Sequence, residues 1–214
     1  MEADDSKVLV TIYPGEPELY SRETMNLSPL WRNQMLKSGK VWLEDHSRDH
    51  LKPLLDILET SLSPRLDVLP SDELSSNDWR DIREAAYDHD VLKYWQTCVR
   101  AALYASRPRL PLHRELQIGL AIEDPKIIVQ ATWEVSSDVL FRMKTSEIKT
   151  IGLERWNRLR GVVEGLGLDS YTTAVGPKLQ EWINKGKEAK LDSGKNVLDT
   201  LFTEAPSWKR SSHY

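Results

Sequence analysis

Apolar and polar positions along the chain predict a few short strands near the start and helices over the rest. Residues 8–12 are rich in β-branched side chains and predict the first strand. Pro14 and Gly15 suit the centre of a type II turn, because proline fixes φ and glycine accepts a positive φ. Residues 18–21 are expected to return as a second strand, and residues 40–43 predict a third.

Between the second and third strands the apolar spacing becomes helical. Two short helices are predicted at residues 23–27 and 29–36. Ser28 is the expected N-cap of the second helix, with a proline in its first turn, and Gly39 is expected to end it. A helix pair is therefore expected between the second and third strands.

A longer helix is predicted at residues 46–60, followed by a loop at residues 61–76. Asn77 or Asp78 is the expected cap of the next helix, and residues 88–90 are a polar break before another one. The apolar stripes of these three helices are Leu51, Leu54, Leu55 and Leu58; Trp79, Ile82 and Ala86; and Leu92, Trp95, Val99, Ala102 and Leu103. From this pattern we expect Trp31, Leu54, Leu55, Leu58 and Trp95 to be buried.

The best candidate boundary lies at residues 107–111, where two prolines end the preceding helix. Everything after it is predicted to be helical. Asp124 and Pro125 are the expected cap and first residue of a helix that continues to Val135. Two further helices have the stripes Leu153, Trp156, Leu159 and Val163, and, after Gly176 and Pro177, Leu179, Trp182 and Ile183. The polar end from about residue 191 is expected to be a flexible tail.

Composition limits the class of protein. The chain has 214 residues, of which 40% are hydrophobic, enough to fill a core. Its formal net charge of −4 offers no global attraction to nucleic acid or to an anionic membrane. Residues 1–5 are acidic, unlike a signal peptide, and no apolar run approaches the roughly 18 residues of a membrane helix. We therefore expect a cytoplasmic or nuclear protein.

Five segments, in this order, resemble one known family. Residues 19–23 are similar to its apolar strand that leads into a polar helix start, and residues 27–36, Leu-Ser-Pro-Leu-Trp-Arg-Asn-Gln-Met-Leu, to its helix-pair signature. Residues 41–45 are similar to the strand and acidic turn that follow, residues 51–58 to the next helix, and residues 85–88, Ala-Ala-Tyr-Asp, to an Ala-x-Tyr-Asp step. The chain thus resembles the BTB/POZ domain family, and most closely the divergent BTB-like proteins of fungi with a helical C-terminal region.

This resemblance implies an α+β fold. Residues 5–104 would form a BTB/POZ-like domain, with a small three-stranded sheet covered by helices. Residues 108–190 would form an all-helical C-terminal extension, and residues 191–214 the flexible tail. The family's members act by binding other proteins, so the resemblance implies an adaptor or scaffold that binds another protein or a second copy of itself.

The resemblance also bears on how partners would bind. Many members exchange a strand in a dimer, but the residues before Val8 are too few to supply it. A dimer would instead use the helix pair around Met25 and Leu27, or the C-terminal helices. Members that recruit cullin ubiquitin ligases usually have a longer segment than residues 37–40 before the third strand, so cullin binding is uncertain.

Two sets of residues in the first part of the chain are candidates for metal binding or catalysis. His46 and His50 have the i, i+4 spacing of a metal-binding pair on a helix, but no third ligand can be located. A solvated, charged helix start is the favoured interpretation. Cys98, the only cysteine, lies between Trp95 and Val99 on an apolar helix, where packing is favoured over catalysis.

Two further sets lie in the second part. The glycines of residues 161–167 have the spacing of a phosphate-binding loop, but they follow a helix and lack the Lys-Ser/Thr pair, which favours helix termination. Arg155, Arg158 and Arg160 surround Trp156 and suggest nucleic-acid contact. Interspersed glutamates favour a solvated helix face instead, so nucleic-acid binding is not expected.

The sequence therefore nominates no catalytic residue, no cofactor and no metal, and its candidate interface residues are Met25 and Leu27. Two alternatives stay open: a small, mostly helical enzyme with an unrecognised site, and a nucleic-acid-linked regulatory protein. A deep polar pocket with perturbed titratable groups would favour the enzyme. A contiguous basic face would favour the regulatory protein.

Overall fold

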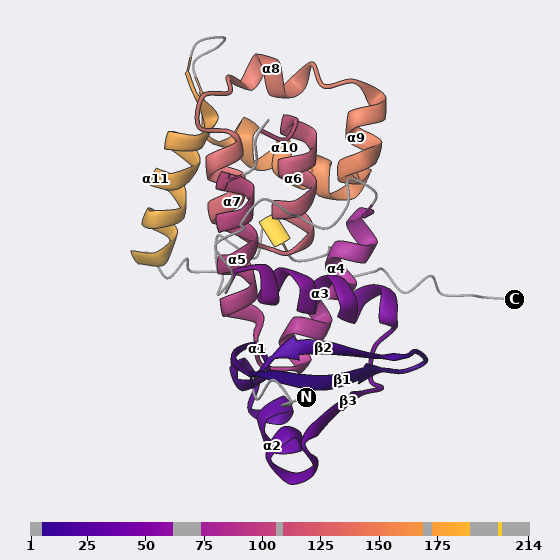
Figure 1. Ribbon diagram of the computed structural model, residues 1–214. Helices are drawn as coiled ribbons and strands as arrows, with labels where there is room; N and C mark the ends of the chain where they lie inside the picture. Colours follow the sequence, from indigo (N-terminus) through magenta and orange to yellow (C-terminus); the bar gives the residue numbers. More distant parts are fainter. Residues whose placement is uncertain (1–5, 62–73, 106–108, 169–172, 189–200, 203–214) are drawn as a thin grey trace, which may run out of the picture. The chain divides into compact units, whose positions relative to one another are not determined.

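The fold was analysed in a computed structural model that describes residues 6–61, 74–105, 109–168, 173–188 and 201–202 (Figure 1). The chain forms two compact units, Met1–Pro111 and Leu112–Tyr214. The first unit contains a small sheet and helices, and the second is helical over its described residues. The fold class is therefore α+β. The predicted tail at residues 191–214, apart from residues 201–202, lies outside the described residues, as does most of the predicted loop at 61–76.

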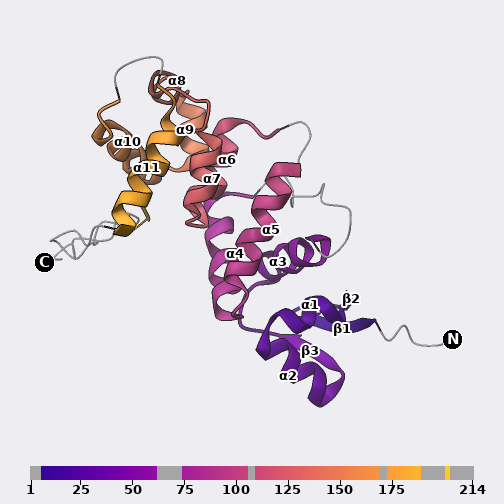
Figure 2. The ribbon, with the colours of Figure 1, turned by 90° about the vertical axis from the view of Figure 1, so that its left-hand side faces the viewer.

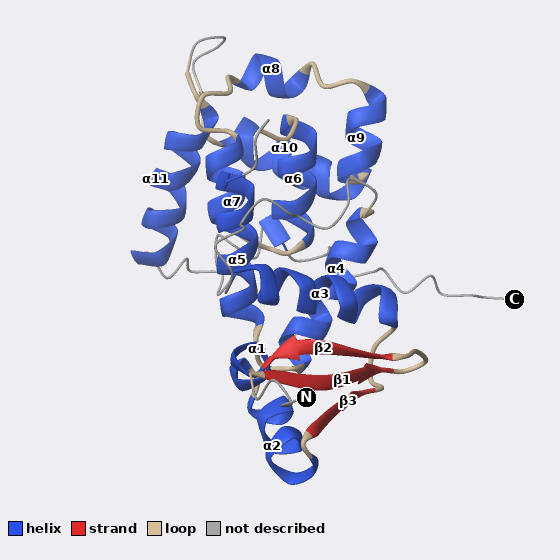
Figure 3. Ribbon diagram, in the orientation of Figure 1, coloured by secondary structure: helices blue, strands red, loops and turns tan. Residues whose placement is uncertain are grey.

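The sheet of the first unit has three strands in the order β2-β1-β3 (Figure 3). These are β1 (Lys7–Ile12), β2 (Pro17–Ser21) and β3 (Lys40–Leu43). β1 pairs antiparallel with β2 and parallel with β3. The parallel pairing is possible because the two helices between β2 and β3 return the chain to the same end of the sheet. All three predicted strands are confirmed.

The connection between β1 and β2 differs from the prediction. Gly15 does not have the positive φ that a type II turn requires, so the predicted turn type is wrong, and the Tyr13–Pro14 peptide bond is cis. A glycine is needed at position 15 because a backbone carbonyl and an arginine side chain lie close to its Cα. A Cβ atom on Gly15 would lie 2.9 Å from the carbonyl oxygen of Ile12 and would overlap the guanidinium of Arg48.

The helix pair consists of α1 (Arg22–Leu27) and α2 (Pro29–Ser38). Ser21 caps α1 through the backbone N–H of Thr24. Ser28 caps α2 as predicted, and Gly39 ends it with φ of 71°. The prediction of two short helices joined at Ser28 is confirmed.

Three longer helices follow, α3 (Arg48–Ser61), α4 (Ser76–Asp88) and α5 (Leu92–Ala105). α3 begins two residues later than predicted, because the carbonyl of Ser47 accepts the first bonds, from the N–H groups of His50 and Leu51. The predicted caps of α4 are also wrong. Ser75 is the N-cap, and Asp78 makes the reciprocal bond of a capping box.

The core of the first unit lies between the sheet and α3, and between α3 and the α4–α5 pair (Figures 1 and 2). Trp31, Leu54, Leu55, Leu58 and Trp95 are all fully buried, which confirms the core predicted from the apolar stripes. Burying side chains of this size removes apolar surface from water and supplies most of the favourable free energy of folding.

The second unit contains six described helices: α6 (Leu112–Ala121), α7 (Pro125–Ala131), α8 (Ser137–Phe141), α9 (Thr145–Ile151), α10 (Leu153–Gly165) and α11 (Val175–Glu188). Asp124 caps α7 as predicted, but the helix ends at Ala131 instead of Val135. The carbonyls of Thr132 and Val135 accept hydrogen bonds from the N–H groups of Gly176 and Val175. The backbone after Ala131 therefore bonds to the start of α11 instead of continuing α7.

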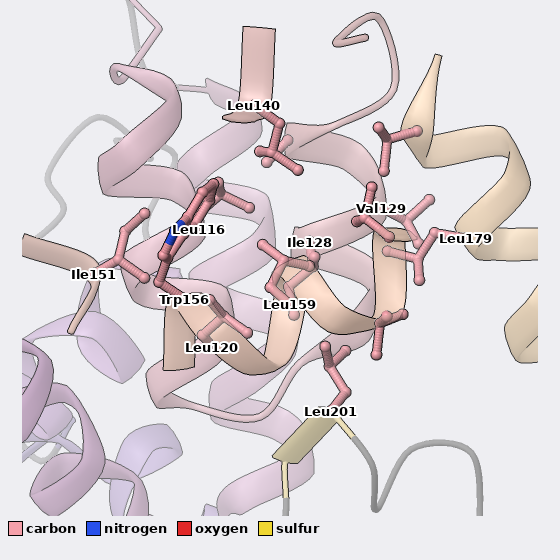
Figure 4. Close-up of a cluster of buried hydrophobic side chains, with 14 of the residues drawn as sticks. Leu116, Leu120, Ile128, Val129, Leu140, Ile151, Trp156, Leu159, Leu179 and Leu201 are labelled. Atoms are coloured by element: carbon pink, nitrogen blue, oxygen red, sulfur yellow. The ribbon is translucent and has the colours of Figure 1, made fainter. Parts of the chain in front are cut away.

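Leucine, isoleucine and valine side chains from all six of these helices pack with Trp156 in one core cluster of the second unit (Figure 4). Leu201 also reaches this cluster and is almost fully buried. Gly119 and Gly176 allow the helices to approach. A Cβ atom would lie 3.0 Å from Ile127 at Gly119, and 2.5 Å from the carbonyl oxygen of Val129 at Gly176. Among the described residues, no helix is long and apolar enough to cross a membrane.

Candidate interaction surface

The two faces of the sheet differ in what covers them. Val10 points to the inner face, toward the core, and is fully buried. Successive strand residues alternate between faces, so Leu9 points to the opposite, outer face. Leu19 pairs with Leu9 across β2, and Trp42 pairs with Thr11 across β3, which places both on the outer face as well.

Leu19 is 63% exposed and Trp42 50%, while Leu9 is half-buried and Thr11 is buried between them. Leu9, Leu19 and Trp42 therefore form a short apolar strip across the three strands, which we call the outer-face patch. Single exposed apolar side chains are ordinary, whereas neighbouring ones on one face are a candidate surface for a partner.

The outer edge of β3 is partly closed by a side chain. The carbonyl of Leu43 accepts the N–H of Tyr13 and so faces the centre of the sheet, which leaves the N–H of Trp42 on the outer edge. Gln34 on α2 covers that group, because its Oε1 accepts the Trp42 N–H at 2.8 Å. An added strand would have to displace this amide.

The outer edge of β2 is partly closed, in two ways. The N–H of Arg22 bonds to the carbonyl of Ser6, so the backbone of Ser21 and Pro17 faces away from β1. Pro17 has no N–H to offer a further strand. The N–H of Ser21 donates to both carboxylate oxygens of Glu59, at 3.1 and 3.0 Å. Each edge is thus covered over part of its length, although the backbone of Leu19 also faces outward, and the outer-face patch is an accessible apolar surface of this sheet.

Glu59 on α3 accepts several hydrogen bonds from residues at the start of α1. Besides the Ser21 N–H, it accepts bonds from the hydroxyls of Ser21 at 2.8 Å and Thr24 at 2.5 Å, and it pairs with Lys7 at 3.0 Å. Burial opposes the ionisation of Glu59, but the bonds from Thr24, Ser21 and Lys7 outweigh it and lower the pKa of the carboxyl. The charged form is therefore part of the folded structure.

A second polar network joins β2 to α3. Glu18 pairs with Arg48 and, at 2.8 Å, with Lys52, and the Tyr20 hydroxyl donates to Asp56 at 3.2 Å. The bond from Lys52 lowers the pKa of Glu18, while burial and then the charge of Asp56 raise the pKa of Tyr20. These directions keep the carboxylate charged and the phenol protonated, so the network fixes the strand to the helix.

The two residues that the sequence nominated as an interface differ in their exposure to solvent. Met25 is fully buried, whereas Leu27 is half-buried and Leu30, at the start of α2, is 51% exposed. Met25 is unavailable to a partner while α1 stays in place. Any contact made by the helix pair would use Leu27 and Leu30.

His46 and His50 do not share a helix face, because His46 precedes α3. Each instead approaches a different carboxylate of α4: His46 Nε2 lies 3.0 Å from Asp88 and His50 Nε2 lies 3.8 Å from Asp81. Over the described ranges, no three His, Cys, Asp or Glu side chains are grouped so that they could hold a metal ion. The predicted i, i+4 helical arrangement of this pair is therefore wrong.

A third histidine, His89, is the titratable group that the sequence did not single out. It is 3% exposed at the C-cap of α4, and its Nδ1 accepts the indole N–H of Trp31 at 3.1 Å. Burial, and next the charge of His46, lower the pKa of His89. The sequence signal for an acceptor such as His89 was Trp31, because the N–H of a buried indole usually has a hydrogen-bond acceptor.

The remaining candidates lie in helices, where several are buried or bond within the chain. Cys98 is buried, as predicted for packing. Trp156 is also buried, and two of the arginines beside it bond within the chain, Arg158 to the carbonyl of Phe202 and Arg160 to Glu164. The glycines at residues 161 and 165 lie within α10, which ends at the second of them.

The residues that sequence reasoning missed are Leu19 and Trp42. A signal was present in residues 40–43, where a tryptophan occupies the position that alternation assigns to the solvent side of the strand. No protein-family model matches this sequence, and neither a curated protein nor a solved structure matches it.

Proposed function

We propose that the first unit is a BTB/POZ-like domain that serves as a protein–protein interaction module, as an adaptor or scaffold, and that it binds its partner through the outer-face patch. The observation that carries this proposal is the half-exposed pair Leu19 and Trp42 on a sheet whose opposite face is buried. The order of strands and helices in this unit, with the helix pair between β2 and β3, supports the family resemblance.

The size of the patch favours a short segment of another protein as the partner. Two half-exposed side chains such as these offer roughly 200 Å² of apolar surface. Stable dimers bury about 800 Å² or more from each subunit, so the patch alone would not hold two copies together. Because both sheet edges are partly covered, we expect recognition to depend mainly on side chains and less on added strand hydrogen bonds.

Affinity capture from the native cell, followed by mass spectrometry, tests this proposal when it is run with matched variants. Leu19→Thr combined with Trp42→Thr removes the patch but keeps β-branched residues that suit a strand. The backbone bond from residue 42 to Gln34 is retained in this variant. Tyr87→Ala is the control, since it removes an aromatic ring that is 68% exposed on α4.

The proposal requires partners that the wild-type chain and the Tyr87→Ala variant both retain and that the double variant loses. Circular dichroism and urea unfolding establish that the double variant is folded. If the folded double variant retains every partner, the outer-face patch is not the docking surface.

A further inference from the structure

The bond between Trp31 and His89 determines which nitrogen of the imidazole carries a proton. The indole nitrogen can only donate, so Nδ1 of His89 must be unprotonated to accept at 3.1 Å. A neutral His89 therefore has its proton on Nε2. The two rings lie with centroids 5.2 Å apart, and Trp31 is fully buried, so neither side chain can turn away without disturbing the core.

Protonation of His89 is incompatible with this arrangement. A proton on Nδ1 would face the indole N–H, so an acceptor would become a second donor and the bond would be lost. The imidazolium would also be buried, and it would face the ring of His46, whose centroid is 5.9 Å away.

The charged and titratable groups around His89 come from two segments. His46 and Asp45 lie between β3 and α3, and Asp88 lies at the end of α4. The charges of Asp45 and Asp88 favour an imidazolium, whereas His46 disfavours it. From α2 the uncharged indole of Trp31 faces His89. Burial and His46 together outweigh the two carboxylates and lower the pKa of His89.

We propose that the Trp31–His89 bond is a pH-sensitive latch, which ties α2 to the end of α4 while His89 is neutral and breaks when His89 is protonated. The same helix carries Gln34, which covers the Trp42 N–H at the edge of β3. Loosening of α2 at acidic pH would also weaken this cover. The latch holds or fails independently of the outer-face patch.

The direction of the pH effect follows from the lowered pKa. The unfolded chain takes up a proton on this histidine near pH 6.5, whereas the folded chain takes it up only at a lower pH. The stabilisation from neutral His89 is therefore complete above about pH 6.5 and is lost as the pH falls toward its folded-state pKa. Over that interval the unfolding equilibrium constant rises about tenfold for each pH unit.

Urea unfolding of the full chain between pH 7.5 and 5.0 tests the latch with two variants. His89→Gln can accept the Trp31 N–H through its amide oxygen but cannot titrate, so it should lose less stability across this range than the wild type. His50→Gln is the matched control, because His50 faces Asp81 instead of Trp31 and should retain the wild-type loss. Equal losses in the wild type and in His89→Gln would overturn the proposal.

NMR titration of the wild-type protein decides the question even if His89→Gln does not fold. The signals of the five histidines are followed with pH, together with the indole N–H of Trp31, which a Trp31→Phe spectrum identifies. The latch requires His89 to titrate below pH 6.5 and the Trp31 indole signal to shift with the same midpoint. In Trp31→Phe the opposing N–H is gone, so His89 should titrate at a higher pH. A Trp31 signal that stays fixed while His89 titrates would contradict the latch.

Discussion

The indole N–H of Trp31 donates to Nδ1 of His89 at 3.1 Å, and both side chains are buried. The two residues are 58 positions apart in the sequence, one on α2 and the other at the end of α4. Their bond satisfies a donor that burial would otherwise leave unpaired. It joins the helix pair that precedes β3 to the helices that follow it.

Removing the Trp31 side chain should strongly destabilise the protein. We expect Trp31→Ala to lower the free energy of unfolding by about 3–5 kcal/mol, the range for emptying a large aromatic site. Trp42→Ala is the control, since it removes an indole that is half exposed, and it should cost much less. Urea unfolding measures both. An unchanged midpoint for Trp31→Ala would show that Trp31 is not part of the core.

Periodicity was sufficient to predict the strands and helices of the first unit and most of their buried stripes, although Leu92 is only partly buried. The positions of Leu51, Leu54, Leu55 and Leu58 repeat with the helical period, so their burial follows from the sequence. The partner of Trp31 could not be found in this way. Periodicity assigns a side chain to a face of its own helix, whereas the Trp31–His89 bond depends on how distant helices pack.

Glu59→Gln should weaken the attachment of α1 to α3. The amide keeps the size of the side chain but loses the charge that accepts bonds from Ser21 and Thr24, and we expect a cost of about 1–3 kcal/mol at pH 7. Because the folded-state pKa is lowered, this stabilisation is present above about pH 4.5 and is lost as the pH falls through the folded value.

Urea midpoints at pH 7 and in the acid range below pH 4.5 test this account of Glu59. The wild type and Glu59→Gln should differ at neutral pH and converge in acid. Glu181→Gln is the control, since Glu181 pairs with Lys178 and Lys185 on the exposed face of α11 and should have little effect. A difference between wild type and Glu59→Gln that persists unchanged at low pH would contradict the role of the charge.

Two glycines of the second unit should respond in opposite directions to alanine. At Gly176 a Cβ atom would lie 2.5 Å from the Val129 carbonyl oxygen and 2.6 Å from the Cα of Trp133, so we expect a loss of about 1–3 kcal/mol. At Gly161, inside α10, nothing lies within 4 Å, and the better helix propensity of alanine should add about 0.5–1 kcal/mol. Thermal unfolding measures both, and a stable Gly176→Ala variant would rule out the close approach of α7 and α11.

Long-range packing also explains why the outer-face patch was not predicted from the sequence. Met25 and Leu27 were expected at an interface because the family resemblance left the helix pair as a surface for a dimer. The spacing of apolar residues in a two-turn helix such as α1 does not show that Met25 faces the core, where it is fully buried. Leu19 and Trp42 become neighbours of Leu9 and Thr11 only through the pairing of three strands. Strand order and register are properties of the folded sheet and cannot be read from each segment separately.

The most direct measurement of the central claim is the dissociation constant of a captured partner for the wild-type chain and for Trp42→Thr. A central aromatic residue of an interface typically contributes 2 kcal/mol or more, so we expect binding to weaken by roughly thirtyfold. Tyr87→Ala should bind within about twofold of the wild type, because surface changes outside an interface have small effects. If folded Trp42→Thr binds the partner as tightly as the wild type, the outer-face patch does not carry the interaction.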